Sequence, residues 1–161
     1  MIDFNLEHIF SFTVELGGMD VIAPLPEGVR ANVYIKSGRV EGPKVQGEIK
    51  PVGGNWSILH PDGVYEINYQ LMVETPDQAL IYITCDGAGD FGEEAYQQYF
   101  QDPGERGQGG REMSRYRPHR TRARCRTAHP DYLWLNRLFC LGIGQGDARE
   151  WNVVYDVYAV S

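Results

Sequence analysis

The feature of this sequence that most constrains its fold is a repeated alternation of apolar and polar residues with a period of two. Phe10, Phe12 and Val14 alternate with a serine and a threonine, which is the pattern of a strand with one buried face. Similar alternation, or short β-branched and aromatic runs, fills most of the chain between glycine, proline and aspartate residues. Strands that follow one another through short turns favour an antiparallel sheet.

The boundaries of the expected elements follow from these interruptions. Strands are predicted over residues 10–15, 31–35, 39–41, 45–52, 55–59, 64–75, 79–85, 120–127, 132–144 and 151–160. Turns are predicted at Gly17–Gly18, Ser37–Gly38, Gly53–Gly54, His60–Gly63, Thr75–Asp77 and Gly144–Asp147. Helical spacing of aromatic residues predicts one short helix over 91–101, with Asp90 as its cap. Residues 102–110 include four glycines and a proline, so we expect a mobile Gly/Arg-rich insertion at about 87–119.

These elements predict one all-β domain over residues 1–161, β-rich with a single short helix. With 161 residues and 42% apolar composition, the chain has enough material for one core. Because strands are expected at both ends of the chain, the sheet can hide its edges by closing. We therefore expect an antiparallel, lipocalin-like, closed or nearly closed β-barrel, with a sandwich as the second choice.

Several classes of function lack their sequence signatures. No apolar run approaches the roughly 20 residues of a membrane span, and residues 1–5 do not resemble a secretory signal. The phosphate loop, the dinucleotide-binding glycine motif, the serine nucleophile elbow and paired cysteine motifs are missing. The four histidines are scattered, and Cys85, Cys125 and Cys140 are widely spaced. We expect a cytoplasmic protein without membrane contact, cofactor or metal, and with buried free thiols.

The charge distribution is strongly asymmetric. The net charge is −7, yet residues 106–126 hold eight of the fifteen basic residues and a single acid. Within this segment, arginines at 120, 122, 124 and 126 alternate with uncharged residues, which predicts a strand with one cationic face. Such a face could bind nucleic acid, pair with acids of a partner subunit, or hold an anionic group of a ligand through Arg124. Nucleic acid is the weakest of these candidates because the rest of the chain is acidic.

Four stretches of the sequence also carry a resemblance to known proteins. They are residues 6–10, 38–47 with Glu41-Gly42-Pro43, 56–63, and 132–137 with Trp134-Leu135-Asn136-Arg137. Together they resemble an uncharacterised family, the domain-of-unknown-function family 3237. The resemblance implies a compact lipocalin-like β-barrel, often a homodimer, with no established general activity. Members usually carry aspartate where this chain has Asn55. If that aspartate acts as an acid–base group in relatives, we do not expect Asn55 to take over this role.

Glu41, Asn136 and Arg137 are the candidate catalytic residues. Gly42 allows a close backbone approach beside Glu41, so the carboxylate could reach inward at the barrel mouth as a general acid or base. The alternative is an acid bonded to backbone amides. Asn136 and Arg137 interrupt an apolar strand expected over 132–141. A buried guanidinium needs a partner, so Arg137 either bridges to an acid such as Glu41 or binds an anionic substrate.

A second group of residues is expected to bind the substrate. It consists of Asn55, Trp56, Tyr69, Tyr82, Arg124, Tyr132 and Trp134. Rigid aromatic rings can line a pocket, and tyrosine hydroxyl groups can orient a ligand in it. The alternative is that the rings belong to the core only.

We therefore predict a cofactor-independent enzyme of the isomerase, cyclase or dehydratase type. Its substrate would be a small hydrophobic metabolite, aromatic or polyketide-like, held inside the barrel. Glu41 would exchange protons, while Arg137 and Asn136 would stabilise enolate charge. Two alternatives remain open. One is a barrel that binds small ligands without reacting with them, and the other is an assembly protein whose arginine strand is the interface of a homodimer.

Overall fold

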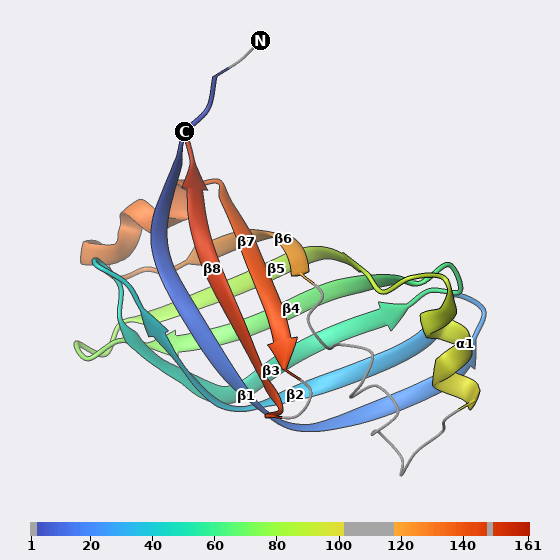
Figure 1. Ribbon diagram of the computed structural model, residues 1–161. Helices are drawn as coiled ribbons and strands as arrows, with labels where there is room; N and C mark the ends of the chain where they lie inside the picture. Colours follow the sequence, from blue (N-terminus) through green and yellow to red (C-terminus); the bar gives the residue numbers. More distant parts are fainter. Residues whose placement is uncertain (1–2, 102–117, 148–149) are drawn as a thin grey trace.

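Eight antiparallel strands form a closed barrel in the part of the chain that the structure describes (Figure 1). The structure is a computed structural model and describes residues 3–101, 118–147 and 150–161. The strands are β1 (Leu6–Leu25), β2 (Gly28–Glu41), β3 (Gly47–Leu59), β4 (Val64–Glu74), β5 (Leu80–Asp90), β6 (Pro118–Arg126), β7 (Cys140–Asp147) and β8 (Asn152–Val160). Each strand pairs with its neighbours in sequence, and β1 also pairs with β8. The predicted all-β, closed antiparallel barrel is confirmed.

Two glycine pairs that were predicted as turns lie inside strands. Gly17–Gly18 belongs to β1, where the register against β2 shifts between Leu16 and Gly18. Gly53–Gly54 belongs to β3, where the register against β4 shifts between Ile49 and Gly53. Such shifts are β-bulges, which bend a strand and increase its twist. These turn predictions are wrong because glycine bends the strands of a closing barrel without ending their pairing.

Of the other four turn predictions, two are wrong and two are confirmed. Ser37–Gly38 lies within β2, where an ideal Cβ on Gly38 would stand 2.4 Å from the carbonyl oxygen of Thr13 in β1. Gly144–Asp147 lies within β7 and pairs with β8. Both turn predictions are therefore wrong. The turns at His60–Gly63 and Thr75–Asp77 are confirmed, between β3 and β4 and between β4 and β5.

The segment predicted as one long strand over 132–144 begins with a helical turn. Pro130–Arg137 is a 3-10 helix, η1, and β7 starts only at Cys140. Pro130 stands in the first turn of η1, where proline costs no hydrogen bond, and Asp131 adds an acid to the same turn. The strand prediction over the first part of this segment is wrong because this local turn chemistry outweighs the strand propensity of the aromatic residues.

The predicted helix is confirmed but shorter. Helix α1 spans Glu94–Gln101. Asp90 lies four residues before it and is not its N-cap, so that prediction is wrong; its carboxylate accepts a hydrogen bond from the backbone N–H of Gly92 (2.8 Å). Helix α1 lies at one end of the barrel and η1 at the other (Figure 1). Residues 102–117, which make up much of the predicted insertion, lie outside the described residues. No helix of the described part is long and apolar enough to cross a membrane.

Alternate residues of the strands fill the interior of the barrel. The main core cluster includes Phe10, Phe12, Ile67, Leu71 and Tyr155, each at most 1% exposed. The rings of Phe12 and Tyr155 stack with their centroids 5.0 Å apart. Burial of one such side chain contributes about 1.5–3 kcal/mol. Because these residues come from strands far apart in the sequence, they pack together only when the barrel is closed.

The three cysteines are buried free thiols, as predicted. Burial raises the pKa of Cys85 to about 12 and that of Cys140 to about 11. Burial also raises the pKa of Cys125. Thiols are reactive as thiolates, so these three side chains act as small core residues at neutral pH.

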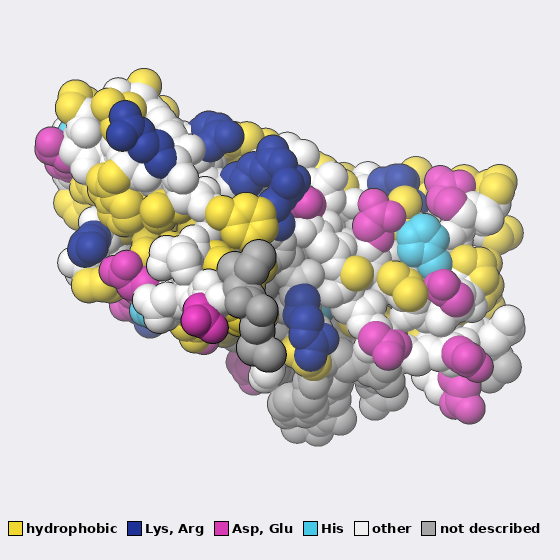
Figure 2. Space-filling model, turned by 90° about the horizontal axis from the view of Figure 1, so that it is seen from above, with side chains coloured by type: hydrophobic (Ala, Val, Ile, Leu, Met, Phe, Trp, Pro, Cys, Tyr) yellow, Lys and Arg dark blue, Asp and Glu magenta, His cyan; other side chains and the backbone are white. Residues whose placement is uncertain are grey.

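The arginine strand is confirmed as β6. Arg120, Arg124 and Arg126 are exposed on the outer face, while every second residue from His119 to Cys125 is buried. Arg122 forms an ion pair with Asp86 of β5 (3.3 Å). Figure 2 shows Lys and Arg side chains among exposed hydrophobic side chains on one face of the molecule.

Gly144 in β7 provides a test of this packing. An ideal Cβ at this position would lie 2.3 Å from Cζ of Tyr155, so we expect Gly144→Ala to lower the free energy of unfolding by about 1–3 kcal/mol. Gly18→Ala is the matched control because a Cβ there meets nothing within 4 Å. Alanine at that position should leave stability unchanged or raise it slightly. Urea denaturation measures both variants, and equal stabilities would contradict the packing described.

Candidate functional site

A group of polar side chains lies inside the barrel toward the end that carries α1. We call Asn55, Ser57, Tyr65, His119 and Tyr155 the interior polar cluster. They come from β3, β4, β6 and β8. Asn55, Ser57 and His119 are 1%, 0% and 3% exposed, and Tyr155 is completely buried. A few converging polar groups in an apolar interior are the usual composition of a small-molecule site.

Three of the five residues of the interior polar cluster form a chain of hydrogen bonds. Asn55 Nδ2 donates to the Tyr65 hydroxyl (3.1 Å), and Asn55 Oδ1 accepts from the backbone N–H of Asn68 (2.9 Å). The Tyr65 hydroxyl donates to Ser57 Oγ (2.7 Å), which donates to the carbonyl oxygen of Ala31 (2.8 Å). These bonds fix the side chains in place, as buried polar groups require.

His119 is different, because one of its ring nitrogens has no hydrogen-bond partner among the described residues. Its Nδ1 lies 3.2 Å from the Tyr155 hydroxyl. Its Nε2 is buried and makes no hydrogen bond within the described part of the chain. A buried polar atom without a partner costs about 1–3 kcal/mol. Among the described residues, Nε2 is therefore an atom of the interior polar cluster with unused hydrogen-bonding capacity.

The missing side chain of Gly144 allows His119 and Tyr155 to meet. Gly144 in β7 pairs with His119 of β6 on one side and with Tyr155 of β8 on the other. Ring atoms of Tyr155 occupy the space where a Gly144 side chain would stand, at 2.3–2.4 Å from its ideal Cβ. The tyrosine ring thus crosses over β7, and its hydroxyl group reaches the imidazole of His119.

Burial keeps both partners of this pair neutral. It lowers the pKa of His119 to about 4. It also raises the pKa of Tyr155 well above 10, with smaller contributions from the neighbouring Tyr69 and Cys85. At neutral pH the tyrosine hydroxyl can therefore donate to Nδ1 of an uncharged imidazole or accept from it. When the hydroxyl donates, the hydrogen of His119 resides on Nε2, because the partner of one ring nitrogen selects the tautomer.

Aromatic rings surround the His119 imidazole. The ring centroids of Tyr65, Phe91 and Tyr155 lie 5.9, 6.2 and 6.0 Å from that of His119. Tyr65 and Phe91 also stack on each other at 4.5 Å. None of the fully buried side chains in the described residues is charged at neutral pH. A ligand beside His119 would meet aromatic walls and neutral hydrogen-bonding groups.

Two residues of the predicted substrate-binding group lie in this region. Asn55 belongs to the interior polar cluster, and Tyr69 pairs with it across β3 and β4. Tyr69 is 2% exposed and makes an edge contact with Tyr155 at 5.8 Å. Trp56 follows Asn55 and therefore lies on the other face of β3, where its ring contacts Tyr34 at 5.8 Å. Alternation along the strand places one neighbour inside and the next outside.

The other predicted substrate-binding residues lie outside the interior polar cluster. Tyr82 is on the outer face of β5, where its hydroxyl donates to Gln70 Oε1 (3.0 Å). Arg124 is exposed on β6. Tyr132 and Trp134 belong to η1. The Tyr132 hydroxyl donates to Asp77 (3.2 Å), and the ammonium group of Lys44 lies over the Trp134 ring at 5.8 Å.

The structure does not bring the predicted catalytic residues together around an interior ligand. Glu41 is 65% exposed, forms an ion pair with Arg39 (3.2 Å) and lines an open groove of about 690 Å³. Asn136 in η1 accepts from the backbone N–H of Thr127 (2.9 Å) and donates to its carbonyl oxygen (2.8 Å). Arg137, at the end of η1, is exposed. The catalytic roles of these three residues remain predictions. The ion pair of Glu41 is with Arg39, whereas the sequence left open an ion pair with Arg137.

Sequence reasoning missed His119, the residue with the most distinctive chemistry in the interior. The signal was present, because His119 alternates with Thr121, Ala123 and Cys125 on the side of β6 opposite to the arginines. That pattern places a histidine on the buried face of a strand. Ser57, Tyr65 and Tyr155 carry no comparable signal, since buried strands commonly contain serine and tyrosine.

Comparison with known proteins shows relatives along the whole chain. A family model described as a protein of unknown function, DUF3237, matches residues 4–160. A UPF0311 protein of Rhodopseudomonas palustris is 28% identical over 161 residues, which cover 96% of this chain and 95% of that protein. These matches agree with the resemblance carried by the sequence motifs.

Solved structures share the barrel. A conserved protein of unknown function from Rhodopseudomonas palustris has a TM-score of 0.82 at 25% identity, covering 100% of both chains. A β-barrel-like protein from Acinetobacter baumannii has a TM-score of 0.79 at 25% identity, covering 100% and 98%. An enzyme from Penicillium herquei has a TM-score of 0.70 at 17% identity, covering 100% and 97%, a likeness of fold alone. The chain thus belongs to the DUF3237 family.

Proposed function

We propose that this protein is a cofactor-independent enzyme of the isomerase, cyclase or dehydratase type, with His119 as its catalytic residue. Its substrate is a small hydrophobic metabolite, aromatic or polyketide-like, bound inside the barrel. The observation that carries the proposal is the buried Nε2 of His119, which lacks a hydrogen-bond partner in the described residues although Nδ1 has one. Natural interiors seldom leave such an atom unpaired, and a catalytic role is one physical explanation for it.

The chemistry follows from the tautomer that Tyr155 selects. With the Tyr155 hydroxyl donating to Nδ1, the Nε2–H of a neutral imidazole donates to an oxygen of the substrate. Isomerisation through an enolate, cyclisation onto an activated carbonyl, and loss of a hydroxyl group all develop negative charge on an oxygen. A fixed donor in an apolar interior stabilises that charge more strongly than water does. Tyr155 is a positioning residue in this scheme.

The surroundings of His119 favour an uncharged, hydrophobic substrate. Tyr65 and Phe91 offer a stacked aromatic surface at 4.5 Å, on which a planar ring system can pack. The fully buried polar residues of the described interior carry no charge that could neutralise an anion, and burying an unpaired charge is costly. Asn55 and Tyr69 stand next to this surface and can orient polar groups of the substrate.

The likeness to the Penicillium herquei enzyme supports the proposal only at the level of the fold. It indicates that a barrel of this shape can carry a catalytic site, whereas function itself depends on the site residues. Binding without turnover is the principal alternative, and a measurement of ligand conversion separates it from catalysis. An interface built on β6 is a further alternative, which would appear as a homodimer that dissociates at high salt.

The catalytic role of His119 can be tested on the ligand of the protein itself. Native mass spectrometry of protein purified from its own cells identifies a bound small molecule, and an extract of the same cells supplies substrates if the barrel is empty. Chromatography then follows conversion at constant mass or with loss of water. We expect His119→Gln to lower turnover about 10²–10⁴-fold, and Tyr155→Phe to lower it less. If the wild type binds the ligand without converting it, the result would favour the alternative of a barrel that binds small ligands without reacting with them.

Glu41→Gln decides between the two catalytic assignments. Glu41 is exposed and paired with Arg39, so the His119 proposal expects turnover by this variant to equal that of the wild type. Loss of turnover in Glu41→Gln, with full activity in His119→Gln, would overturn the proposal and support the assignment made from the sequence.

His119 should also make stability depend on pH. Its pKa is about 4 in the folded protein and about 6.5 in the unfolded chain. The unfolded state therefore binds more protons between these values, and stability falls as the pH is lowered through that range. We expect this histidine to cost the wild type about 2 kcal/mol between pH 7 and pH 5. His119→Gln should lack this loss, while the exposed His8→Gln should retain it. Equal pH dependence in all three proteins would contradict a buried neutral His119.

A further inference from the structure

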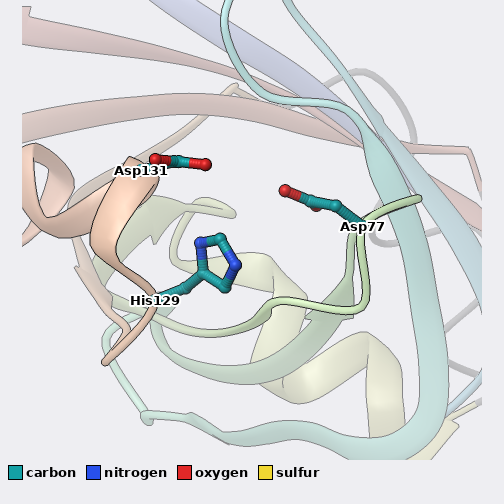
Figure 3. A group of neighbouring side chains, drawn as sticks. All are labelled: Asp77, His129 and Asp131. Carbon is teal, nitrogen blue, oxygen red and sulfur yellow. The ribbon is translucent and has the colours of Figure 1, made fainter.

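Three potential metal ligands meet at the end of the barrel that carries η1, away from His119. Asp77 lies in the turn between β4 and β5, while His129 and Asp131 lie at the start of η1. Their ligand atoms all lie within 4.8 Å of one another. Figure 3 shows the two carboxylates directed toward each other across a gap, with the imidazole beside it.

The separations of these ligand atoms are compatible with a shared ion. Around a tetrahedral zinc ion, with bonds of about 2.0–2.2 Å, ligand atoms lie about 3.3–3.6 Å apart, so side chains whose ligand atoms lie within 4.8 Å of one another can share one after small rotations. His129 Nδ1 is buried and has no hydrogen-bond partner among the described residues. The nearby carboxylates therefore do not satisfy this nitrogen directly, which leaves it with the capacity to bind an ion.

Surrounding contacts hold the proposed ligands in position. The Thr75 hydroxyl and the Tyr132 hydroxyl (3.2 Å) both donate to Oδ1 of Asp77. The Tyr132 ring also lies against the His129 ring at 5.5 Å, and the backbone N–H of His129 donates to Thr127 Oγ1 (3.2 Å). Outer contacts of this kind orient ligands in known metal sites.

We infer that Asp77, His129 and Asp131 form a binding site for a divalent transition-metal ion, with zinc as its expected occupant. One imidazole nitrogen and two carboxylate oxygens suit zinc, whereas calcium and magnesium prefer oxygen ligands alone. Asp77 and Asp131 are exposed, so water can complete the coordination, as at zinc sites with three protein ligands.

A zinc ion at this site would connect two segments that are distant in sequence. It would join the β4–β5 turn to η1, which covers the same end of the barrel. Binding to the folded state alone stabilises a protein according to ligand concentration and affinity. Zinc should therefore raise the melting temperature. Because His119 lies toward the opposite end, the metal site and the proposed catalytic site stand or fall separately.

Zinc titration of the full-length chain after chelator treatment tests this site. Isothermal titration calorimetry should show one zinc ion per chain, and a thermal melt should show a higher melting temperature with zinc. His129→Gln and Asp131→Asn should each weaken binding at least about tenfold and remove the thermal shift. Asp131→Asn keeps the test decisive if His129→Gln folds poorly, because Asp131 is exposed and the substitution is isosteric.

His60→Gln is the matched control. His60 Nε2 lies 3.2 Å from Glu66, so this pair also places an imidazole beside a carboxylate, but it is not part of the three-ligand group. The control should bind zinc as the wild type does. Absence of saturable zinc binding by the wild type, or equal affinity in both site variants, would overturn the inference.

Discussion

The pairing of β1 with β8 is the interaction on which the rest of the structure depends. Residues Leu6 to Glu15 of β1 pair with Val160 to Asn152 of β8, and this ladder converts an open sheet into a closed barrel. Closure removes the two exposed edges. It also defines an inner and an outer face for every strand. The alternation of side chains between these faces places Phe12 and Tyr155 in the core and the arginines of β6 outside.

Closure in turn requires bent strands and positions without side chains. The register shifts at Leu16–Gly18 and at Ile49–Gly53 bend β1 and β3, and glycine is the residue that permits such bends at little steric cost. Gly144 serves a second purpose, because the ring of Tyr155 occupies the place of its side chain. The contact between Tyr155 and His119 is thus a direct consequence of a missing methyl group on the strand between them.

The closed barrel presents different chemistry at its two ends. Near α1, aromatic rings and neutral hydrogen-bonding groups surround His119, which suits an uncharged organic ligand. Near η1, Asp77, His129 and Asp131 offer charged ligand atoms in contact with water, which suits an ion. Membership of the DUF3237 family and the shared barrel of its solved relatives leave the activity open, because function depends on such sites and not on the fold. The two proposals therefore rest on residues of this chain.

The sequence by itself determined the fold class, the outward arginines and the buried thiols, because period-two alternation assigns the two faces of a strand. It also named Asn55 and Tyr69 as candidate ligand contacts, and the structure places both in the barrel interior. Only the tertiary structure decided that Gly17–Gly18 and Gly53–Gly54 bend strands, since turns and bulges use the same residues. The tertiary structure likewise decided that Pro130–Arg137 is helical. Barrel closure and strand register alone make His119 a neighbour of Tyr155, and Asp77 a neighbour of His129. The members of each pair are 36 or more positions apart in the sequence.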